Sequence, residues 1–478
     1  METYDIVVLG GGSGSKVATA GATQGLETAV VEPGPLGGAC ITRGCVPSKA
    51  LIHRADVLEE VRSAESVGVD AQVTDVDYDE ITAAIHDTVY EQAAKKAANL
   101  QANDNVTLYR GVGRFVDDRT IEIEPTDETT DAERIRGETV VIAVGGRPVE
   151  PPIDGLEDVD YRTSDDVLFL DDRPDKLVIV GGGYIGAELG YFFGALETDV
   201  SIVGRSDRLV PREDDDVSAV VTDSLATHCD VYTGYEAAVV AETDGGVTVT
   251  ADPVDDEAGA DAIELAGDEL LLAAGRRPNT DTLDLGATGV ETDETGAVET
   301  DEFLKTTANG IWALGDAVGE PPFKHAADYE TRVVTENVLE ESQRAVDYEA
   351  MPHAVFTDPQ VASVGRTEGD LAEEGRAYEA VTVPYGAAPL GMILEADDGF
   401  VKALAGPDGE ILGCHIVGPQ ASTLLHEVVV AMDGGGTVDD VADPVHVHPA
   451  LNEVVYAAFD ELSDTTYSTA PDWRDVSS

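Results

Sequence analysis

The sequence predicts an α/β protein, and three observations carry this prediction. A strand-like apolar run, a glycine-rich turn and a helix-like segment follow one another twice, beginning near residues 4 and 176. The chain also has 478 residues, which is too long for one hydrophobic core and suits about three domains. Because each glycine-rich unit has the order of a nucleotide-binding βαβ fold, we expect two Rossmann-like dinucleotide-binding domains, followed by a C-terminal α+β domain.

The first unit has a strand-like run over residues 4–9, a turn, a helix and a second apolar run that ends at Glu32. This spacing matches a dinucleotide fingerprint. Gly10 permits the tight turn, Gly12 lets the backbone approach a pyrophosphate, and the acid accepts a ribose hydroxyl. Ser15 stands where a third glycine or alanine is usual, which makes close packing of the helix on the strand less certain there.

The second unit has glycine at all three fingerprint positions, Gly181, Gly183 and Gly186. Its second strand ends not in an acid but in Gly204, followed by Arg205, with further arginines at positions 208 and 212. An acid would accept the 2′-hydroxyl of NAD, whereas arginine can hold the 2′-phosphate of NADP. This unit therefore predicts an NADPH site. An ordinary surface arginine cluster is less favoured, because Lys and Arg total 29 against 95 acidic residues.

A cysteine pair, Cys40 and Cys45, directly follows the first unit and holds half of the four cysteines in the chain. The gap allows the Cα atoms to approach within the roughly 4.4–6.8 Å that a disulfide needs. Cys45 is expected to open a helix, whose N-terminus favours a thiolate. A structural disulfide or two buried thiols are the alternatives for such a pair. The adjoining nucleotide unit favours a redox pair.

These motifs resemble one family nearly end to end, the FAD-dependent pyridine nucleotide-disulfide oxidoreductases, which include glutathione reductase, dihydrolipoyl dehydrogenase and mercuric reductase. The similarity also covers residues 143–148 and 274–279, which look like chain crossings between domains, and residues 311–316, 356–365 and 446–453. The resemblance implies an FAD-binding domain over 1–148 and 279–345, an NADPH-binding domain over 149–278, and a dimerisation domain over 346–478.

The resemblance also implies which residues bind the two cofactors. The expected FAD contacts are Gly10, Gly12, Ser13, Gly14, Glu32, Gly38, Lys49, Gly145, Asp316 and Ala326. The expected NADPH contacts are Gly181, Gly183, Tyr184, Ile185, Gly186, Arg205, Arg212 and Gly275. By the same resemblance, Asp316 binds the flavin ribityl chain and Tyr184 covers the nicotinamide pocket.

In the family, the second cysteine, here Cys45, lies against the flavin and forms a charge-transfer thiolate, while the first, Cys40, attacks the substrate disulfide. A lysine near the flavin pairs with a glutamate of the NADPH domain, which maps onto Lys49 and Glu188. A solvated helix lysine is the alternative for Lys49.

Thiol exchange leaves a poor leaving group unless a proton arrives, so an acid–base with a pKa near the working pH is required. His448 is the candidate, and Glu453 would orient its ring as carboxylate partners do elsewhere. Ala450 and Asn452 replace a Thr and a Ser common in the family, which leaves the dyad intact. Because this histidine reaches the other subunit's cysteines in the family, the resemblance implies a homodimer.

The substrate is expected to be a small disulfide. The Cys-Val-Pro-Ser-Lys run is shared by dihydrolipoyl dehydrogenases and mercuric reductases, but Arg205 indicates NADPH, and no C-terminal cysteine pair like that of mercuric reductases is present. Resemblance and elimination favour reduction of bis-γ-glutamylcystine to γ-glutamylcysteine. The alternatives are dihydrolipoamide oxidation with NAD, mercuric reduction, and a flavin-binding subunit without catalysis.

The net charge of −66 indicates a halophile's cytoplasm, because such a surface repels itself unless salt screens it. We expect the acidic blocks at 171–172, 213–216 and 255–257 to coat the surface, and nucleic-acid binding to be opposed. Disorder is the competing explanation, but 42% hydrophobic residues argue against it.

Other features of the sequence set further expectations. No run of 18 apolar residues and no signal peptide is visible, few cysteines fit a reducing cytosol, and no metal site is expected. Residues 117–138 look like an acidic hairpin or loop insertion, and residues 468–478 like a tail.

Overall fold

The N-terminal sheet carries the first glycine-rich unit. The computed structural model describes residues 1–126, 133–255, 259–340 and 342–463. In this part of the chain the strands have the order β3-β2-β1-β6-β5-β4, with β17 beside β6. They are β1 (Glu2–Leu9), β2 (Thr28–Val31), β3 (Val106–Tyr109), β4 (Gly111–Phe115), β5 (Thr120–Pro125), β6 (Glu133–Ile142) and β17 (Ile311–Ala313). The pairs β1·β2, β2·β3, β1·β6 and β6·β17 are parallel, as the βαβ pattern predicts.

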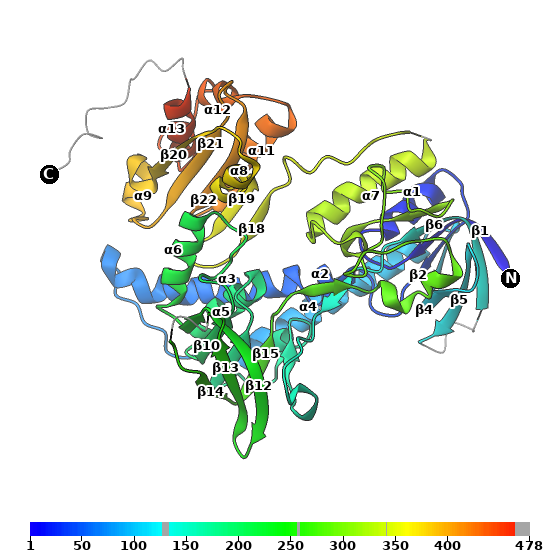
Figure 1. Cartoon of the computed structure of the whole chain (residues 1–478), viewed down its shortest axis with the longest axis horizontal. Coiled ribbons are helices and arrows are strands. Elements are labelled where there is room, and N and C mark those ends of the chain that lie inside the picture. Colours follow the sequence, from blue (N-terminus) through cyan, green and yellow to red (C-terminus); the bar gives the residue numbers. More distant parts are fainter. Residues whose placement is uncertain (127–132, 256–258, 341, 464–478) are drawn as a thin grey trace.

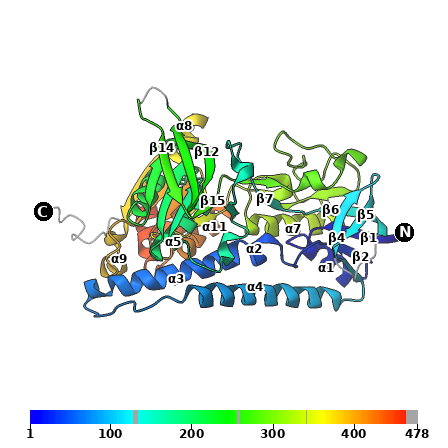
Figure 2. The same ribbon diagram turned by 90° about the horizontal axis from the view of Figure 1, so that it is seen from below.

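Helices cover this sheet and extend beyond it (Figures 1 and 2). They are α1 (Ser15–Thr23), α2 (Gly38–Thr42), α3 (Cys45–Ser63), α4 (Tyr78–Gln101) and α7 (Lys324–Leu339). Figure 2 shows the long helices α3 and α4 side by side, with α3 reaching from the N-terminal sheet to the other end of the molecule. Helix α3 is therefore placed to link the N-terminal sheet to the rest of the chain.

The second sheet carries the second glycine-rich unit, with strand order β11-β10-β9-β15-β8. Its strands are β8 (Arg162–Thr163), β9 (Lys176–Val180), β10 (Asp199–Gly204), β11 (Asp230–Thr233) and β15 (Glu269–Leu272). An antiparallel sheet of β12 (Tyr235–Thr243), β13 (Gly246–Pro253) and β14 (Ile263–Gly267) packs beside it, with helices α5 (Tyr184–Ala195) and α6 (Asp215–Leu225). The two chain crossings between domains that the sequence predicts contain β7 (Gly146–Pro148) and β16 (Arg276–Pro278). These two strands pair antiparallel.

The C-terminal region is α+β, as predicted. Its antiparallel sheet has the order β18-β19-β22-β21-β20. The strands are β18 (His353–Val355), β19 (Val361–Gly365), β20 (Glu379–Pro384), β21 (Phe400–Ala405) and β22 (Ile411–Val417). The helices are α8 (Glu368–Glu374), α9 (Pro389–Ile393), α10 (Ala421–Leu424), α11 (His426–Asp433), α12 (Val438–Ala442) and α13 (Asn452–Leu462). The fold class that the sequence predicts, two parallel α/β units and a C-terminal α+β unit, is confirmed.

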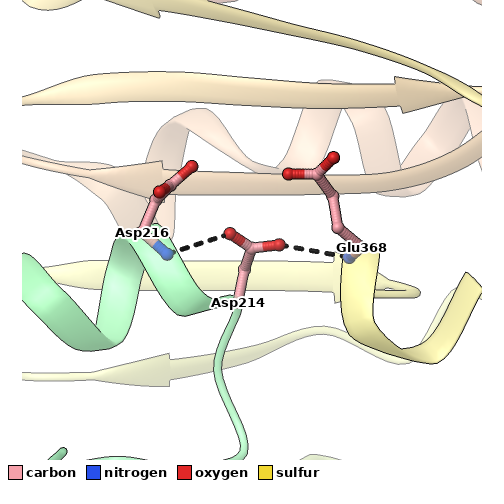
Figure 3. Close-up of side chains that lie close together, drawn as sticks. All are labelled: Asp214, Asp216 and Glu368. Carbon is pink, nitrogen blue, oxygen red and sulfur yellow. Dashed lines mark hydrogen bonds between the residues drawn. The ribbon is translucent and has the colours of Figure 1, made fainter. Parts of the chain in front are cut away.

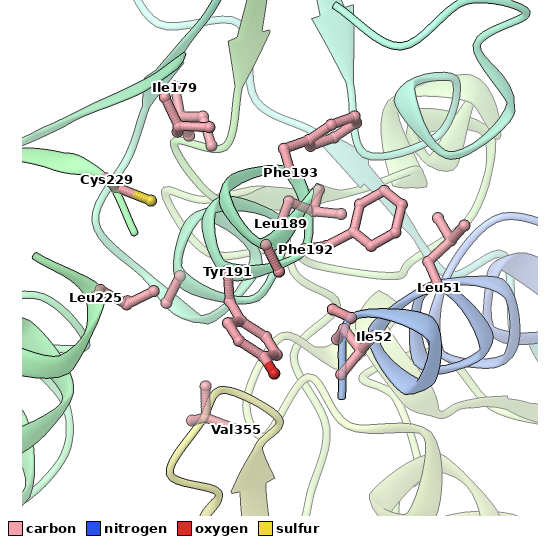
Figure 4. Close-up of a cluster of buried hydrophobic side chains, with 14 of the residues drawn as sticks. Leu51, Ile52, Ile179, Leu189, Tyr191, Phe192, Phe193, Leu225, Cys229 and Val355 are labelled. Atoms are coloured by element: carbon pink, nitrogen blue, oxygen red, sulfur yellow. The ribbon is translucent and has the colours of Figure 1, made fainter. Parts of the chain in front are cut away.

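One hydrophobic cluster joins all three regions (Figure 4). Leu51 and Ile52 of α3 pack in the same core as Tyr191 and Phe192 of α5 and Val355 of β18, and all five are buried. Truncating a core aromatic to alanine typically costs about 3–5 kcal/mol. This packing fixes the direction of α3, and with it the position of the cysteine at its first residue.

The prediction for the acidic block 213–216 is half wrong. Glu213 and Asp214 are buried, whereas residues 215 and 216 are exposed. Asp214 meets Lys402, a buried lysine of β21 whose ammonium contacts Asp214 and Asp216 at 2.7 Å each, as well as Glu368. Glu213 bonds instead to His353 and Ser363. Figure 3 shows the three carboxylates converging from α6, its preceding loop and α8. Three carboxylates this close together could bind a metal ion, but here the Lys402 ammonium is the cation that they contact.

The structure describes only part of the other acidic segments that the sequence predicts to be exposed. Residues 171 and 172 are exposed as predicted, as is 255, while 256 and 257 lie outside the described residues. Within 117–138, β5 and β6 form an antiparallel hairpin that is part of the N-terminal sheet, with its tip, residues 127–132, outside the described residues. The expected tail at 468–478 also lies outside them. Among the helices that the structure describes, none is both long and apolar enough to cross a membrane.

Candidate active site

A cleft of about 2650 Å³ runs between the regions. Typical small-molecule pockets measure roughly 300–1,000 Å³, so this cleft has room for more than one ligand. Both glycine-rich turns, both cysteines of the predicted pair and the arginines after β10 line it. The cleft therefore brings most of the predicted site residues together.

The first glycine turn forms a narrow cradle at one end of the cleft. Gly10 has φ +115°, and a Cβ there would meet the carbonyl oxygen of Ala143 at 2.1 Å. A Cβ on Gly38 would meet the Cα of Gly12 at 3.0 Å. Only glycines permit this backbone approach, and a dinucleotide pyrophosphate is the group that such a cradle admits.

The Glu32 carboxylate is held at the end of β2 by two backbone donors. Gly11 donates to its Oε2 at 2.6 Å, and Gly34 donates to its Oε1 at 2.8 Å. Burial raises the pKa of Glu32 despite these two donors. The acid is thus fixed where the fingerprint predicts a ribose contact.

The other predicted FAD contacts divide into three groups. Gly14, Gly145 and Asp316 line the cleft, and burial raises the pKa of Asp316. Ser13 also lines it, but its hydroxyl donates to Asp328 at 2.9 Å. The Ala326 side chain is buried and is not part of the cleft lining. Ala326 lies in the first turn of α7, where a backbone N–H has no acceptor within the helix. These residues fit an FAD molecule along the cleft.

The cysteine pair sits at the junction of two helices. Cys40 lies in α2, and Cys45 is the first residue of α3. Gly44 allows the sharp connection, because a Cβ there would come within 3.0 Å of the Ala39 carbonyl oxygen. A hydrogen bond from Cys40, opposed by burial and helped by the charge of Lys49, lowers the pKa of Cys45 to about 6. The same interaction raises the pKa of Cys40. Cys45 is therefore the first of the two thiols to ionise.

Lys49 and Glu188 form the ion pair that the sequence predicts. The Lys49 Nζ lies 2.5 Å from Glu188 Oε2 and 5.0 Å from the centre of the Phe356 ring. The other oxygen of Glu188 accepts the backbone N–H of Phe356 at 3.0 Å. One lysine of α3 is thus tied to α5 and to the C-terminal region, one turn after Cys45.

Tyr184 opens α5 and lines the cleft. Its hydroxyl donates to the buried Glu213 at 2.6 Å, and its ring stacks on Phe323 and His353. Glu213 also bonds to His353 Nε2 at 2.8 Å and accepts from Ser363 at 2.6 Å. Sequence reasoning missed Glu213 because it sits in an acidic run, and its partners lie far away along the chain.

The second glycine turn has the same geometry as the first. A Cβ on Gly181, at φ +131°, would meet the Ala273 carbonyl oxygen at 2.3 Å. Gly183 has no atom within 4 Å of such a Cβ and lies open to the cleft, together with Ile185 and Gly275. Gly186 is not part of the lining; a Cβ there would come within 2.0 Å of the Gly181 carbonyl oxygen. Its role in the structure is close packing of the helix on the turn.

The three arginines after β10 all line the cleft but differ in their contacts. Arg208 donates to the Asp215 carbonyl oxygen at 2.5 Å, and Arg212 pairs with Glu320 at 2.9 Å. Arg205 directly follows the last residue of β10, and its side chain is exposed. Arg205 is therefore better placed than Arg212 to receive a phosphate.

His448 and Glu453 form the predicted dyad. The ring Nδ1 lies 2.8 Å from Glu453 Oε1, and the other carboxylate oxygen accepts the Ala450 N–H at 3.0 Å. The His448 side chain is 68% exposed and is not part of the lining of the cleft that holds Cys40 and Cys45. Within one chain, the structure does not bring the dyad to the cysteines.

The neighbouring His446 pairs with Glu427 at 3.0 Å, which raises the pKa of His446.

Comparison with known proteins agrees with this geometry. Residues 4–338 match the family model described as pyridine nucleotide-disulphide oxidoreductase, and residues 351–459 match the dimerisation domain of that family. Dihydrolipoyl dehydrogenase 3 of Haloarcula marismortui is 37% identical over 457 residues, covering 95% of each chain. Mycothione reductase of Mycobacterium tuberculosis is 34% identical over 466 residues, covering 95% of this chain and 98% of the relative. Haloarchaeal relatives also agree with the acidic, halophilic composition.

A solved structure extends the likeness to three dimensions. The Cu(II) complex of the HOCl-induced flavoprotein disulfide reductase RclA from Escherichia coli superposes with a TM-score of 0.86 at 27% identity, covering 97% of this chain and all of that chain. The cysteine pair, the two nucleotide folds and these matches lead to one conclusion. The chain belongs to the pyridine nucleotide-disulfide oxidoreductase family of FAD-containing enzymes.

Proposed function

We propose that the protein is an NADPH-dependent reductase of a small disulfide, with bis-γ-glutamylcystine as its substrate. The observation that carries the proposal is Arg205, which follows β10 where an NAD site would carry an acid. The haloarchaeal dihydrolipoyl dehydrogenases make dihydrolipoamide oxidation with NAD the second candidate. The mycothione reductase shows that relatives this similar also include reductases of a thiol's disulfide.

The division of the chain supports this reaction. We propose that residues 1–148 and 279–345 bind FAD, that 149–278 bind NADPH, and that 346–478 form the dimer interface. The sheets support these limits, because β7 and β16 pair where the chain leaves and re-enters the first region. The FAD would be held by Gly12, Gly38, Glu32 and Asp316, and when bound it supplies two-electron transfer from the nicotinamide to the cysteine pair.

The chemistry of the cysteines follows from their placement. Cys40, as thiolate, attacks one sulfur of the substrate and forms a mixed disulfide, while the other sulfur leaves as a thiol after taking a proton. Cys45, already ionised near neutral pH, then attacks the Cys40 sulfur. This step releases the second thiol and closes the Cys40–Cys45 disulfide. Two electrons from NADPH reopen that disulfide for the next turnover.

The proton for the leaving thiol is assigned to His448. Its exposed ring, oriented by Glu453, supports the proposal that it acts on the cysteines of a second subunit. The match of residues 351–459 to a dimerisation domain supports the same arrangement. The few cysteines and the acidic surface fit a reducing, salt-rich cytoplasm.

The test of the nicotinamide assignment is Arg205→Glu, with Lys176→Glu as a control at an exposed site on β9. A charge-assisted phosphate contact is worth roughly 1.5–3 kcal/mol. The kcat/KM ratio of NADPH to NADH should therefore fall at least about tenfold in Arg205→Glu and stay unchanged in the control. An unaltered ratio in Arg205→Glu would place the 2′-phosphate elsewhere and favour the NAD-linked reaction.

A further inference from the structure

The buried carboxylate of Glu213 connects the second nucleotide unit to the C-terminal region. Its side chain is 0% exposed. Oε1 accepts the Tyr184 hydroxyl at 2.6 Å and lies 2.8 Å from His353 Nε2, while Oε2 accepts the Ser363 hydroxyl at 2.6 Å. Figure 1 shows α6, which begins two residues after Glu213, between the second sheet and the C-terminal sheet. Glu213 therefore ties the first residue of α5 to two strands of another region.

The charge of Glu213 strengthens its hold on Tyr184. Burial alone would raise the pKa of Glu213, but the hydrogen bonds from His353, Ser363 and Tyr184 lower it. A hydrogen bond to an ionised group is stronger than one between neutral groups, and a buried carboxylate that loses a donor is destabilised. Moving the Tyr184 ring away from Glu213 therefore costs free energy that moving an unanchored ring would not.

Neighbouring rings restrict Tyr184 further. The centre of the Tyr184 ring lies 5.9 Å from that of His353 and 6.5 Å from that of Phe323, and the planes are within 18° of parallel. All three rings line the cleft. They come from α5, from β18 and from the residue before α7. The tyrosine is thus held at its hydroxyl and over its ring by parts of all three regions.

The position of Tyr184 relates this anchor to the nucleotide. Tyr184 directly follows Gly183 of the second glycine turn and opens α5. Glu188 lies four residues further on, hence on the same face of the helix, and pairs with Lys49, one turn after Cys45. Tyr184 therefore borders the part of the cleft between the glycine turn and the redox pair. A nicotinamide must enter this part to pass electrons toward Cys45.

We propose that Glu213 is a positioning residue that fixes Tyr184 as a rigid wall of the nicotinamide pocket. The nucleotide then binds against the ring without displacing it. A mobile ring would instead have to break its bond to Glu213 each time a nucleotide enters. A wall already in place favours binding, because the nucleotide does not have to order it. The inference rests on the proposed nucleotide site at 149–278, and it holds for NADPH and NADH alike because the ring lies at the nicotinamide end.

The test is Tyr184→Phe, which keeps the ring but removes its bond to Glu213. The matched control is Tyr191→Phe on the same helix, whose hydroxyl donates to Asp56 and which is not part of the cleft lining. Calorimetry on the FAD-loaded enzyme gives the Kd of NADP⁺ and of 2′-phospho-ADP-ribose, the same nucleotide without nicotinamide. We expect Tyr184→Phe to raise the Kd of NADP⁺ about tenfold, the size of one charge-assisted contact, and to leave that of the fragment within about twofold. Tyr191→Phe should change neither value.

Glu213→Gln tests the other partner of the bond, since the amide keeps the size of the side chain and removes its charge. It should raise the Kd of NADP⁺ and spare the fragment, as Tyr184→Phe does. A lower Kd of NADP⁺ in Tyr184→Phe would show that the ring must be displaced on binding, and an unchanged Kd would show that it does not touch the nicotinamide. Equal rises for NADP⁺ and the fragment would leave Glu213 a structural role only.

Failure of the NADPH assignment is distinguishable from failure of the wall. If Arg205→Glu leaves the ratio of NADPH to NADH unaltered, NAD⁺ and ADP-ribose become the matched pair of ligands. Tyr184→Phe should then raise the Kd of NAD⁺ alone. A fall, no change, or an equal rise with ADP-ribose would again reject the wall.

Discussion

At the scale of single residues, the two thiols of the redox pair differ sharply in their readiness to ionise. The pKa of Cys45 is lowered to about 6, first by the hydrogen bond from Cys40 and then by Lys49. The thiolate form of Cys45 therefore predominates above about pH 6 and is lost as the pH falls through that value. Cys40 keeps its proton longer and needs a base during turnover.

We predict that the two-electron-reduced enzyme shows a long-wavelength thiolate-to-flavin band that disappears below about pH 6. Cys40→Ser should keep the band and stop turnover, whereas Cys45→Ser should lose the band. Anaerobic titration followed by absorbance measures both. A band that survives in Cys45→Ser would reverse the two assignments.

His448 is predicted to affect only the thiol half of the reaction. His448→Ala should slow reduction of the substrate disulfide by roughly 10²- to 10⁴-fold, the usual contribution of a positioned acid–base. Flavin reduction by NADPH, followed by stopped flow, should be nearly unchanged because the ring is not part of the cleft lining. Equal slowing of both half-reactions would remove His448 from this role.

At the scale of elements, the connection of α6, α8 and β21 depends on one buried lysine. The Lys402 side chain is 3% exposed and bonds to Asp214, which is 1% exposed. Lys402→Met would leave the buried Asp214 carboxylate without a cation, and breaking a buried ion pair typically costs about 3–5 kcal/mol. Lys176→Met, at an exposed pair on β9, should cost less than about 1 kcal/mol.

The pH dependence of this loss has a definite sign. The hydrogen bond from Lys402 is the largest factor that lowers the pKa of Asp214, against the effect of burial. The stabilisation from the Asp214–Lys402 pair is therefore fully present above the pKa of an aspartate in the unfolded chain. It is lost as the pH falls through the lower pKa of Asp214 in the folded protein. Urea denaturation at fixed salt should show the Lys402→Met deficit shrinking on acidification. A deficit that grows as the pH falls would contradict the assignment.

The elements also show what the sequence could predict. Gly10, Gly181 and the Cys40–Cys45 pair were predictable because each belongs to a motif whose residues lie within a few positions of one another. The backbone that the two glycines approach, at Ala143 and Ala273, lies far along the chain and was not predictable. Glu213 and Lys402 were not, because their contacts come from segments about 140–190 residues away. In a chain with 95 acidic residues, an acidic run predicts an exposed segment. Its burial could be predicted only if the distant residues that contact it were known. His448 was predictable as a dyad with Glu453, but within one chain the structure does not bring this dyad into the cleft that holds the cysteines.

At the scale of the whole molecule, the net charge of −66 dominates behaviour in solution. Ion pairs with 29 basic residues cannot balance so many carboxylates, and self-repulsion destabilises the folded chain until salt screens it. The melting temperature should rise between about 0.1 M and 2 M KCl, where the Debye length falls from about 10 Å toward 3 Å. A flat melting temperature across this range would count against a halophilic origin.

The most direct test of the central claim is NADPH oxidation at high salt, with bis-γ-glutamylcystine, oxidised glutathione, lipoamide and Hg²⁺ offered separately. The cysteinyl carboxylates of bis-γ-glutamylcystine are free, whereas glutathione blocks them with glycines, and sites that pair polar groups reject poor matches strongly. We predict the highest kcat/KM for bis-γ-glutamylcystine and almost no turnover with Hg²⁺. Faster turnover of lipoamide, above all dihydrolipoamide oxidation with NAD, would contradict the account and assign the protein to dihydrolipoyl dehydrogenase.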